Sequence, residues 1–166
     1  MLKRILAAVD GSEYALRAAG FAAELARQAG AELMVIVVDD GKPLASALVK
    51  LQNVERLSRA EIFDRILENA VKRCSSTAGA NVRTILAKGD PAEKVLAAAD
   101  AEASDLIVAG ARGLGPLRQL LLGSVSSKLI QLSGRPCLIV PPPGRSRQKA
   151  AGANERQGAD PRTAIR

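Results

Sequence analysis

The segment SDLIVAGARGLGPLRQLLLGSVSSKLIQLSGRPCLIV (residues 104–140) contains two short apolar runs, LIVAG and CLIV, separated by a glycine-rich loop. Continuous apolar runs of this length are typical of strands that are buried on both faces of a parallel sheet. The stretch SVSSKLIQLSG, between the loop and the second run, predicts a helix. A strand, a helix and a strand in this order form the repeating unit of an α/β fold.

The same alternation extends back to the start of the chain. We expect strands at 4–9, 32–40, 81–89, 104–110 and 136–143, and helices at 13–30, 54–74, 90–103 and 124–134. The segment 42–51 fits either a short helix or a covering loop. The alternation predicts a single doubly wound α/β domain over residues 1–143, with helices on both faces of a five-stranded parallel sheet. We expect the strand order 3-2-1-4-5.

The positive charge of the chain is concentrated in its last part. The 166 residues carry a net charge of +7, and residues 144–166, with six basic and two acidic side chains, account for +4 of it. Ile165 is the one large apolar residue of this tail, which we expect to be disordered because burial cannot offset its ordering entropy. Any nucleic-acid binding is expected to be weak and to use the tail.

Composition also bears on location and chemistry. No run approaches the roughly 20 apolar residues of a membrane span, and the start MLKRILAAVDGSE lacks the length of a signal peptide's apolar region. Two well-separated cysteines favour a reducing compartment, so we expect a cytoplasmic protein. The sequence contains no histidine, which removes the usual general base and the commonest metal ligand.

The glycine-rich loop is the candidate for ligand binding. Gly110 ends the expected fourth strand and Asp10 follows the first, and ligands of open parallel sheets bind beyond the carboxyl ends of strands. Gly123 precedes the last helix, whose N-terminal N–H groups are suited to phosphate, and Ser124 and Ser126 could add hydroxyl donors. A plain turn-rich loop, with Asp10 serving only as a helix cap, is the alternative.

Two common phosphate motifs are absent from this loop. The P-loop requires a lysine after its last glycine, which LGSVS lacks, and Arg118 stands where the third glycine of GxGxxG belongs.

Asp39 and Asp40 are expected to end the second strand rather than to bind metal.

The spacing Gly110-x2-Gly113-x9-Gly123-Ser124 matches the pattern G-x2-G-x9-G-[ST], and in this the chain resembles the ATP-binding universal stress proteins. ILAAVDGSEYALRAA, GDPAEKVLAAADAEASDLIVAGARG and LLGSVSSKLIQLSGRPCLIV are similar to other segments of that family. The resemblance covers about residues 1–142 and is weakest over 41–74.

The resemblance implies a role for each matching position. Asp10 would lie near the ribose and a phosphate-bound Mg²⁺ or Mn²⁺, Ala8 and Val9 would line the adenine end, and the backbone of Val38 would meet the adenine edge. The remaining residues would surround the ribose and phosphates: Gly110, Arg112, Gly113, Gly123, Ser124, Val125 and Ser126. A homodimer through the strand 136–141 is also implied. The chain departs from the family where Ala111 often is serine and Val37 often is histidine.

These residues predict an ATP-binding, nucleotide-responsive stress regulator with no catalytic residue and little or no turnover. The alternative is an enzyme of the same fold, either a slow ATP hydrolase or an adenylating enzyme. Related adenylating enzymes carry SGGxDS after the first strand, where this chain has VDGSEYA. A third hypothesis, nucleic-acid binding through the tail, requires an affinity that falls steeply with salt.

We predict that deletion of residues 144–166 leaves the melting temperature and the nucleotide affinity nearly unchanged, because the tail has little apolar surface to bury. Thermal unfolding of the full and truncated chains, with and without ATP, measures both quantities. A fall of several degrees in the truncated chain would show that the tail packs on the domain.

Overall fold

The computed structural model describes residues 1–44, 57–78, 82–113 and 122–142. Its elements are, in chain order, β1 (Arg4–Val9), α1 (Glu13–Ala29), β2 (Glu32–Asp39), α3 (Arg59–Ala78), β3 (Val82–Lys88), α4 (Pro91–Ala101), β4 (Leu106–Gly110), α5 (Ser124–Leu132) and β5 (Cys137–Val140). All neighbouring strands pair in parallel, in the order β3-β2-β1-β4-β5. The predicted fold class and strand order are confirmed.

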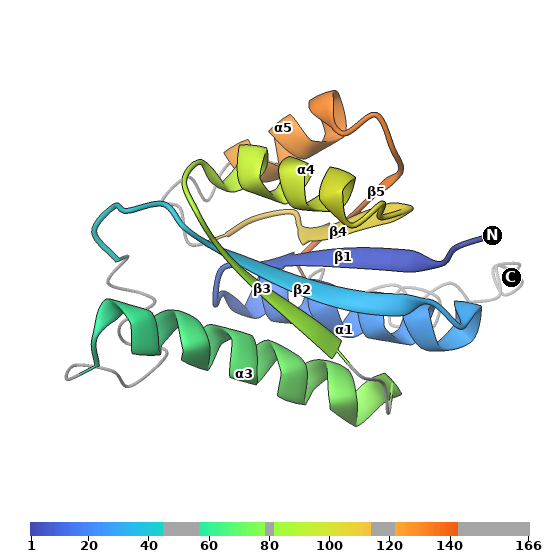
Figure 1. The fold of residues 1–166 in the computed structure, drawn as a ribbon, viewed down its shortest axis with the longest axis horizontal. Helices are drawn as coiled ribbons and strands as arrows, with labels where there is room; N and C mark the ends of the chain where they lie inside the picture. Colours follow the sequence, from blue (N-terminus) through green and yellow to red (C-terminus); the bar gives the residue numbers. More distant parts are fainter. Residues whose placement is uncertain (45–56, 79–81, 114–121, 143–166) are drawn as a thin grey trace, which may run out of the picture.

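The sheet separates two hydrophobic cores (Figure 1). Helices α1 and α3 cover one face, where the small side chains of α1 pack beside larger ones of α3 such as Ile66. Helices α4 and α5 cover the other face, with Val95 and Leu129 fully or almost fully buried against Leu6 and Ile107 of the strands. The three inner strands β1, β2 and β4 are therefore mostly buried on both faces, as their continuous apolar runs predict, whereas the edge strands β3 and β5 are more exposed.

Side chains cap the starts of two helices. At the start of α1 the Ser12 hydroxyl accepts a hydrogen bond from the Ala15 N–H, and Gly30 ends the helix in the left-handed conformation with φ of 64°. At the start of α4 the Asp90 side chain accepts from the N–H groups of Ala92 and Glu93. These caps fix the helix ends that lie beyond β1 and β3.

The long helix before β3 differs from its predicted range of 54–74. Residues 57 and 58 precede the helix, which begins at Arg59 and continues to residue 78. The start is fixed by a reciprocal cap: the Ser58 N–H donates to the Glu61 carboxylate (2.7 Å), and the Glu61 N–H donates to the Ser58 hydroxyl (3.3 Å).

Several expectations fall on undescribed residues. Residues 45–51 of the segment 42–51 and the tail 144–166 lie outside the described residues, and residues 42–44 form neither helix nor strand. No helix in the described part of the chain is long and apolar enough to span a membrane.

Candidate functional site

The predicted site residues lie at the carboxyl ends of β1, β2 and β4, in the segments that follow β1 and β4, and at the start of α5. β1 is the central strand, with Ala8 paired in register with Ala109 of β4 and Val9 with Val37 of β2. The turn after β1 begins at Asp10, and β4 ends at Gly110. The structure thus places the first turn beside the loop that follows β4.

The Asp10 carboxylate faces this loop. One of its oxygens, Oδ1, accepts a hydrogen bond from the Ser12 N–H at 2.9 Å, which closes the turn into α1 around Gly11 with φ of 83°. The other oxygen, Oδ2, would lie 2.2 Å from a Cβ placed on Gly113. Asp10 therefore supports the turn and also fills the space where a side chain at position 113 would stand.

Gly110 lets β4 approach the first turn of α1. A Cβ at this position would lie 3.1 Å from the Tyr14 carbonyl carbon, 3.2 Å from the Ala15 nitrogen and 3.1 Å from the Arg112 carbonyl oxygen. All three are backbone atoms that cannot rotate away as a side chain can. The need for glycine at position 110 comes from packing within the protein.

Gly123 has no such packing reason. Its φ of −74° and ψ of 162° are open to any residue, and an added Cβ would lie 3.5 Å from the Ala111 carbonyl oxygen, an ordinary contact. Its N–H donates to that carbonyl at 2.7 Å, which joins the start of α5 to the loop after β4. Within the described residues, neither space nor backbone conformation explains this glycine.

The N-terminus of α5, next to the loop after β4, has no side-chain cap among the described residues. Gly123 occupies the cap position and no side chain in the described ranges caps the helix. The N–H groups of the first helical turn normally need such a partner. Ser124 is exposed and Val125 is partly buried.

Ser126 has a different environment from the phosphate-facing one that we expected. Its hydroxyl is buried and donates to the Gly110 carbonyl at 2.7 Å. Its hydroxyl hydrogen is therefore used to hold α5 against the end of β4. Arg112 is partly buried and already interacts within the protein.

The end of β2 projects beyond β1. The β1–β2 ladder ends with the pair Val9 and Val37, whereas the β2–β3 ladder continues to the pair Asp39 and Lys88. Val38 therefore lies past the last residue of β2 that is paired with β1. The role that the family resemblance implies for its backbone stays a prediction.

The two departures from the family pattern are both buried. Val37 is fully buried in the core beneath α1 and α3, and Ala111 is 4% exposed. Apolar side chains at these positions fill space inside the domain.

Arg59 is a residue of this edge that sequence reasoning missed. Its Nε lies 2.8 and 2.9 Å from the two carboxylate oxygens of Asp39, and its Nη1 donates to the Lys42 carbonyl at 2.7 Å. The guanidinium also lies 5.5 Å from the Phe63 ring centre. The nearby guanidinium lowers the pKa of Asp39 from its usual value, so this carboxylate stays charged at neutral pH.

Metal binding by side chains alone has little support here. No group of three acidic or cysteine side chains that could hold an ion occurs among residues 1–44, 57–78, 82–113 and 122–142. Asp10 is the predicted metal residue, and a cation there would need further oxygen ligands, such as phosphate.

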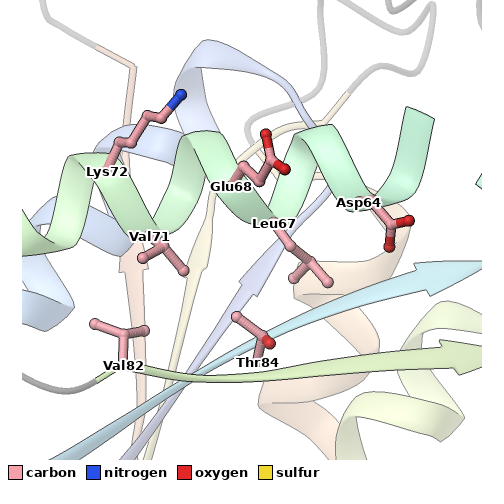
Figure 2. Close-up of a pocket in the computed structure, with 7 residues that line it drawn as sticks. All are labelled: Asp64, Leu67, Glu68, Val71, Lys72, Val82 and Thr84. Carbon is pink, nitrogen blue, oxygen red and sulfur yellow. The ribbon is translucent and has the colours of Figure 1, made fainter. Parts of the chain in front are cut away.

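A groove of about 610 Å³ lies elsewhere, between α3 and β3. Figure 2 shows Leu67 and Val71 pointing from α3 toward Val82 and Thr84 of the strand. None of its lining residues belongs to the predicted nucleotide site.

Comparison with known proteins identifies the family. The model of the universal stress protein family matches residues 1–141. The chain belongs to this family. The universal stress protein YxiE of Bacillus subtilis is 36% identical over 148 residues, with 84% of this chain and 99% of YxiE covered.

Solved structures agree with this assignment. The structure of MJ0577, a universal stress protein of Methanocaldococcus jannaschii, superposes with a TM-score of 0.69 at 28% identity, with coverage of 86% of this chain and 97% of that one. A universal stress protein in complex with cAMP superposes with a TM-score of 0.66 at 24% identity, with coverage of 84% and 97%.

The two glycines should differ in their effect on stability. We predict that Gly110→Ala lowers the free energy of unfolding by about 1–3 kcal/mol, the usual cost of overpacking, because three backbone atoms crowd the added methyl group. Gly123→Ala should change it by less than about 0.5 kcal/mol, as at an unconstrained site. Urea unfolding without nucleotide measures both, and equal losses would contradict this account of the loop.

Proposed function

We propose that this universal stress protein binds ATP or a related adenine nucleotide, together with Mg²⁺ or Mn²⁺, and acts as a nucleotide-responsive regulator. The proposal depends mainly on the presence of a glycine, Gly123, at the cap position of α5. Its backbone conformation and its contacts with the described residues would admit a side chain, yet a glycine occupies the cap position of α5, where no side chain of the described ranges caps the helix. A phosphate that approaches this backbone would explain why a side chain is absent.

The phosphates would bind at the start of α5. The N–H groups of Ser124, Val125 and Ser126 form its first turn, and the helix dipole adds about 0.3–2 kcal/mol for an anion there. The bond from Ser126 to the Gly110 carbonyl keeps this turn against β4. Ser124, which is exposed, could add a hydroxyl donor.

Asp10 would complete the phosphate end through the cation. Its Oδ2 faces Gly113, across the loop from the helix start. A divalent cation held between this carboxylate and phosphate oxygens would have the oxygen ligands that Mg²⁺ prefers. Arg112, in the same loop, could supply positive charge.

The base would lie toward β2. Ala8 and Val9 end β1 on one side, and Val38 extends past them on the other. Its backbone groups could then meet the hydrogen-bonding edge of adenine. A structure of the same fold was solved with cAMP, but its likeness to this chain concerns the fold, so the assignment rests on the residues described above.

Turnover is expected to be slow or absent. Fast phosphoryl transfer needs a residue that orients or deprotonates the attacking group. The sequence has no histidine, and Asp10 is assigned to the cation while its Oδ1 accepts from the Ser12 N–H. Regulation would instead follow from a partner that prefers either the nucleotide-bound or the free form.

We predict that Mg²⁺ with ATP stabilises the fold by about 2.7 kcal/mol at a hundredfold excess over the dissociation constant. The stabilisation should decrease from wild type to Gly123→Ala and be almost lost in Gly123→Val, because each larger side chain occupies more of the phosphate position. Thermal unfolding with and without Mg²⁺ and ATP measures it.

Gly20→Ala is the matched control for this series. It adds the same methyl group on α1, where the movable end of the Arg73 side chain lies 3.3 Å away. The control should keep the full ATP response. Undiminished stabilisation of Gly123→Val by ATP would rule out the proposed phosphate position.

We also propose a homodimer through the strand 136–141. β5 is an edge strand, and its residues Cys137, Leu138 and Ile139 are partly exposed. The preceding helix exposes Ile130 (49%) and Leu132 (65%). An apolar edge with unpaired backbone groups favours pairing with a second copy.

Hydrogen exchange at two protein concentrations tests the dimer. Amides of β5 should become better protected at high micromolar concentration, because pairing with the second copy occupies them. Amides of β3, the opposite edge strand, are the internal control and should not change. Sedimentation as a monomer at micromolar concentration would contradict the dimer.

A further inference from the structure

Arg59 joins three segments of the chain at the end of β2. It is the first residue of α3, its guanidinium holds the Asp39 carboxylate through Nε, and its Nη1 holds the Lys42 carbonyl. Nη2 makes a further close contact with Asp39 and lies 3.8 Å from an oxygen of Asp40. A fork of donors that engages one carboxylate at two atoms fixes orientation as well as distance.

Asp39 is held from its other sides too. Its Oδ1 accepts from the Gly41 N–H at 2.9 Å, and its carbonyl accepts from the Gly89 N–H at 2.9 Å. The Asp39 side chain is 12% exposed and that of Arg59 is 34% exposed, so solvent screens the pair less than a fully exposed one. The last residue of β2 is therefore fixed to both β3 and α3.

The neighbouring residue, Val38, is the one proposed to meet the base. Pairing with β1 has already ended at Val37, so the direction of the strand at Val38 depends on β3 and on the contacts of Asp39. We propose that Arg59 is a positioning residue for base recognition, which acts through Asp39 to hold the backbone of Val38 in place. This inference rests on the proposed nucleotide site.

The pair should keep its charge across the working pH range. The Arg59 guanidinium lowers the pKa of the Asp39 carboxyl, and the carboxylate raises the pKa of the guanidinium. A lowered carboxyl pKa gives stability that is present above its unfolded value and is lost only as the pH falls through the folded one. Positioning by Arg59 is therefore constant from neutral to mildly acidic pH.

The experiment compares two ligands, ATP and inorganic tripolyphosphate, each with Mg²⁺. Arg59→Met removes the donors but keeps an unbranched apolar chain beside Phe63. This substitution should lower the affinity for ATP by about tenfold, which is within the range of coupling free energies between residues of one hydrogen-bond network. Tripolyphosphate has no base, so its affinity should not change. Thermal shifts and calorimetry, at a temperature where circular dichroism shows a native fold, give both affinities.

Two further variants separate positioning from general weakening of the fold. Lys72→Met removes an exposed positive charge from the same helix and should leave the affinities for both ligands unchanged. Asp39→Asn should lower the affinity for ATP by a similar factor. The double variant should lose no more affinity than either single variant, because both residues act through one contact. Asp39→Asn also provides the test if Arg59→Met does not fold.

The outcomes distinguish this inference from the proposed function. If Arg59→Met lowers the affinities for ATP and tripolyphosphate equally, or leaves the affinity for ATP unchanged, the proposed role of Arg59 is overturned while the nucleotide site remains. A folded wild-type protein that binds neither ligand would overturn the site itself.

Discussion

The growth of the sheet in two directions from β1 is the constraint on which the rest of the structure depends. The chain first adds β2 and β3 on one side of β1 and then crosses to add β4 and β5 on the other. Because crossovers between parallel strands are right-handed, the helices before and after this change of direction cover opposite faces (Figure 1). After β1 the chain leaves toward α1, and after β4 it leaves toward α5, so the carboxyl ends of these neighbouring strands mark the place where open parallel sheets generally bind ligands.

The glycines of the loop after β4 have different surroundings. A Cβ at Gly110 would meet backbone atoms of α1, and a Cβ at Gly113 would meet the Asp10 carboxylate. Gly123 alone of the three makes only ordinary contacts with the described residues, and this is compatible with the proposed ligand approaching its backbone. The three glycines of one sequence motif therefore have two different settings in the structure. Gly110 and Gly113 lie against α1 and Asp10, whereas Gly123 lies at the start of α5.

The regular elements could be predicted from sequence because their causes are local. Apolar runs predicted the strands, and the caps Ser12 and Asp90 each bind N–H groups within three residues along the chain. The contact between Arg59 and Asp39 joins residues 20 positions apart, so no local pattern contains it. The Ser58–Glu61 cap that starts α3 was a readable signal, but it lies in the part of the chain with the weakest resemblance. The direction of the Ser126 hydroxyl depends on how α5 packs on β4, which the spacing of glycines does not determine.

In the proposed function, the same arrangement would let a nucleotide be sensed without a chemical reaction. Asp10 belongs to the turn that enters α1, and Gly123 belongs to the start of α5, so the two lie on elements that cover opposite faces of the sheet. In the proposed function, a nucleotide and its cation between them would join the two layers. Gly113, Leu122 and Ser124 are exposed around this junction. A partner that contacts these residues would meet a different surface in the bound and free forms, which is the differential affinity that regulation requires.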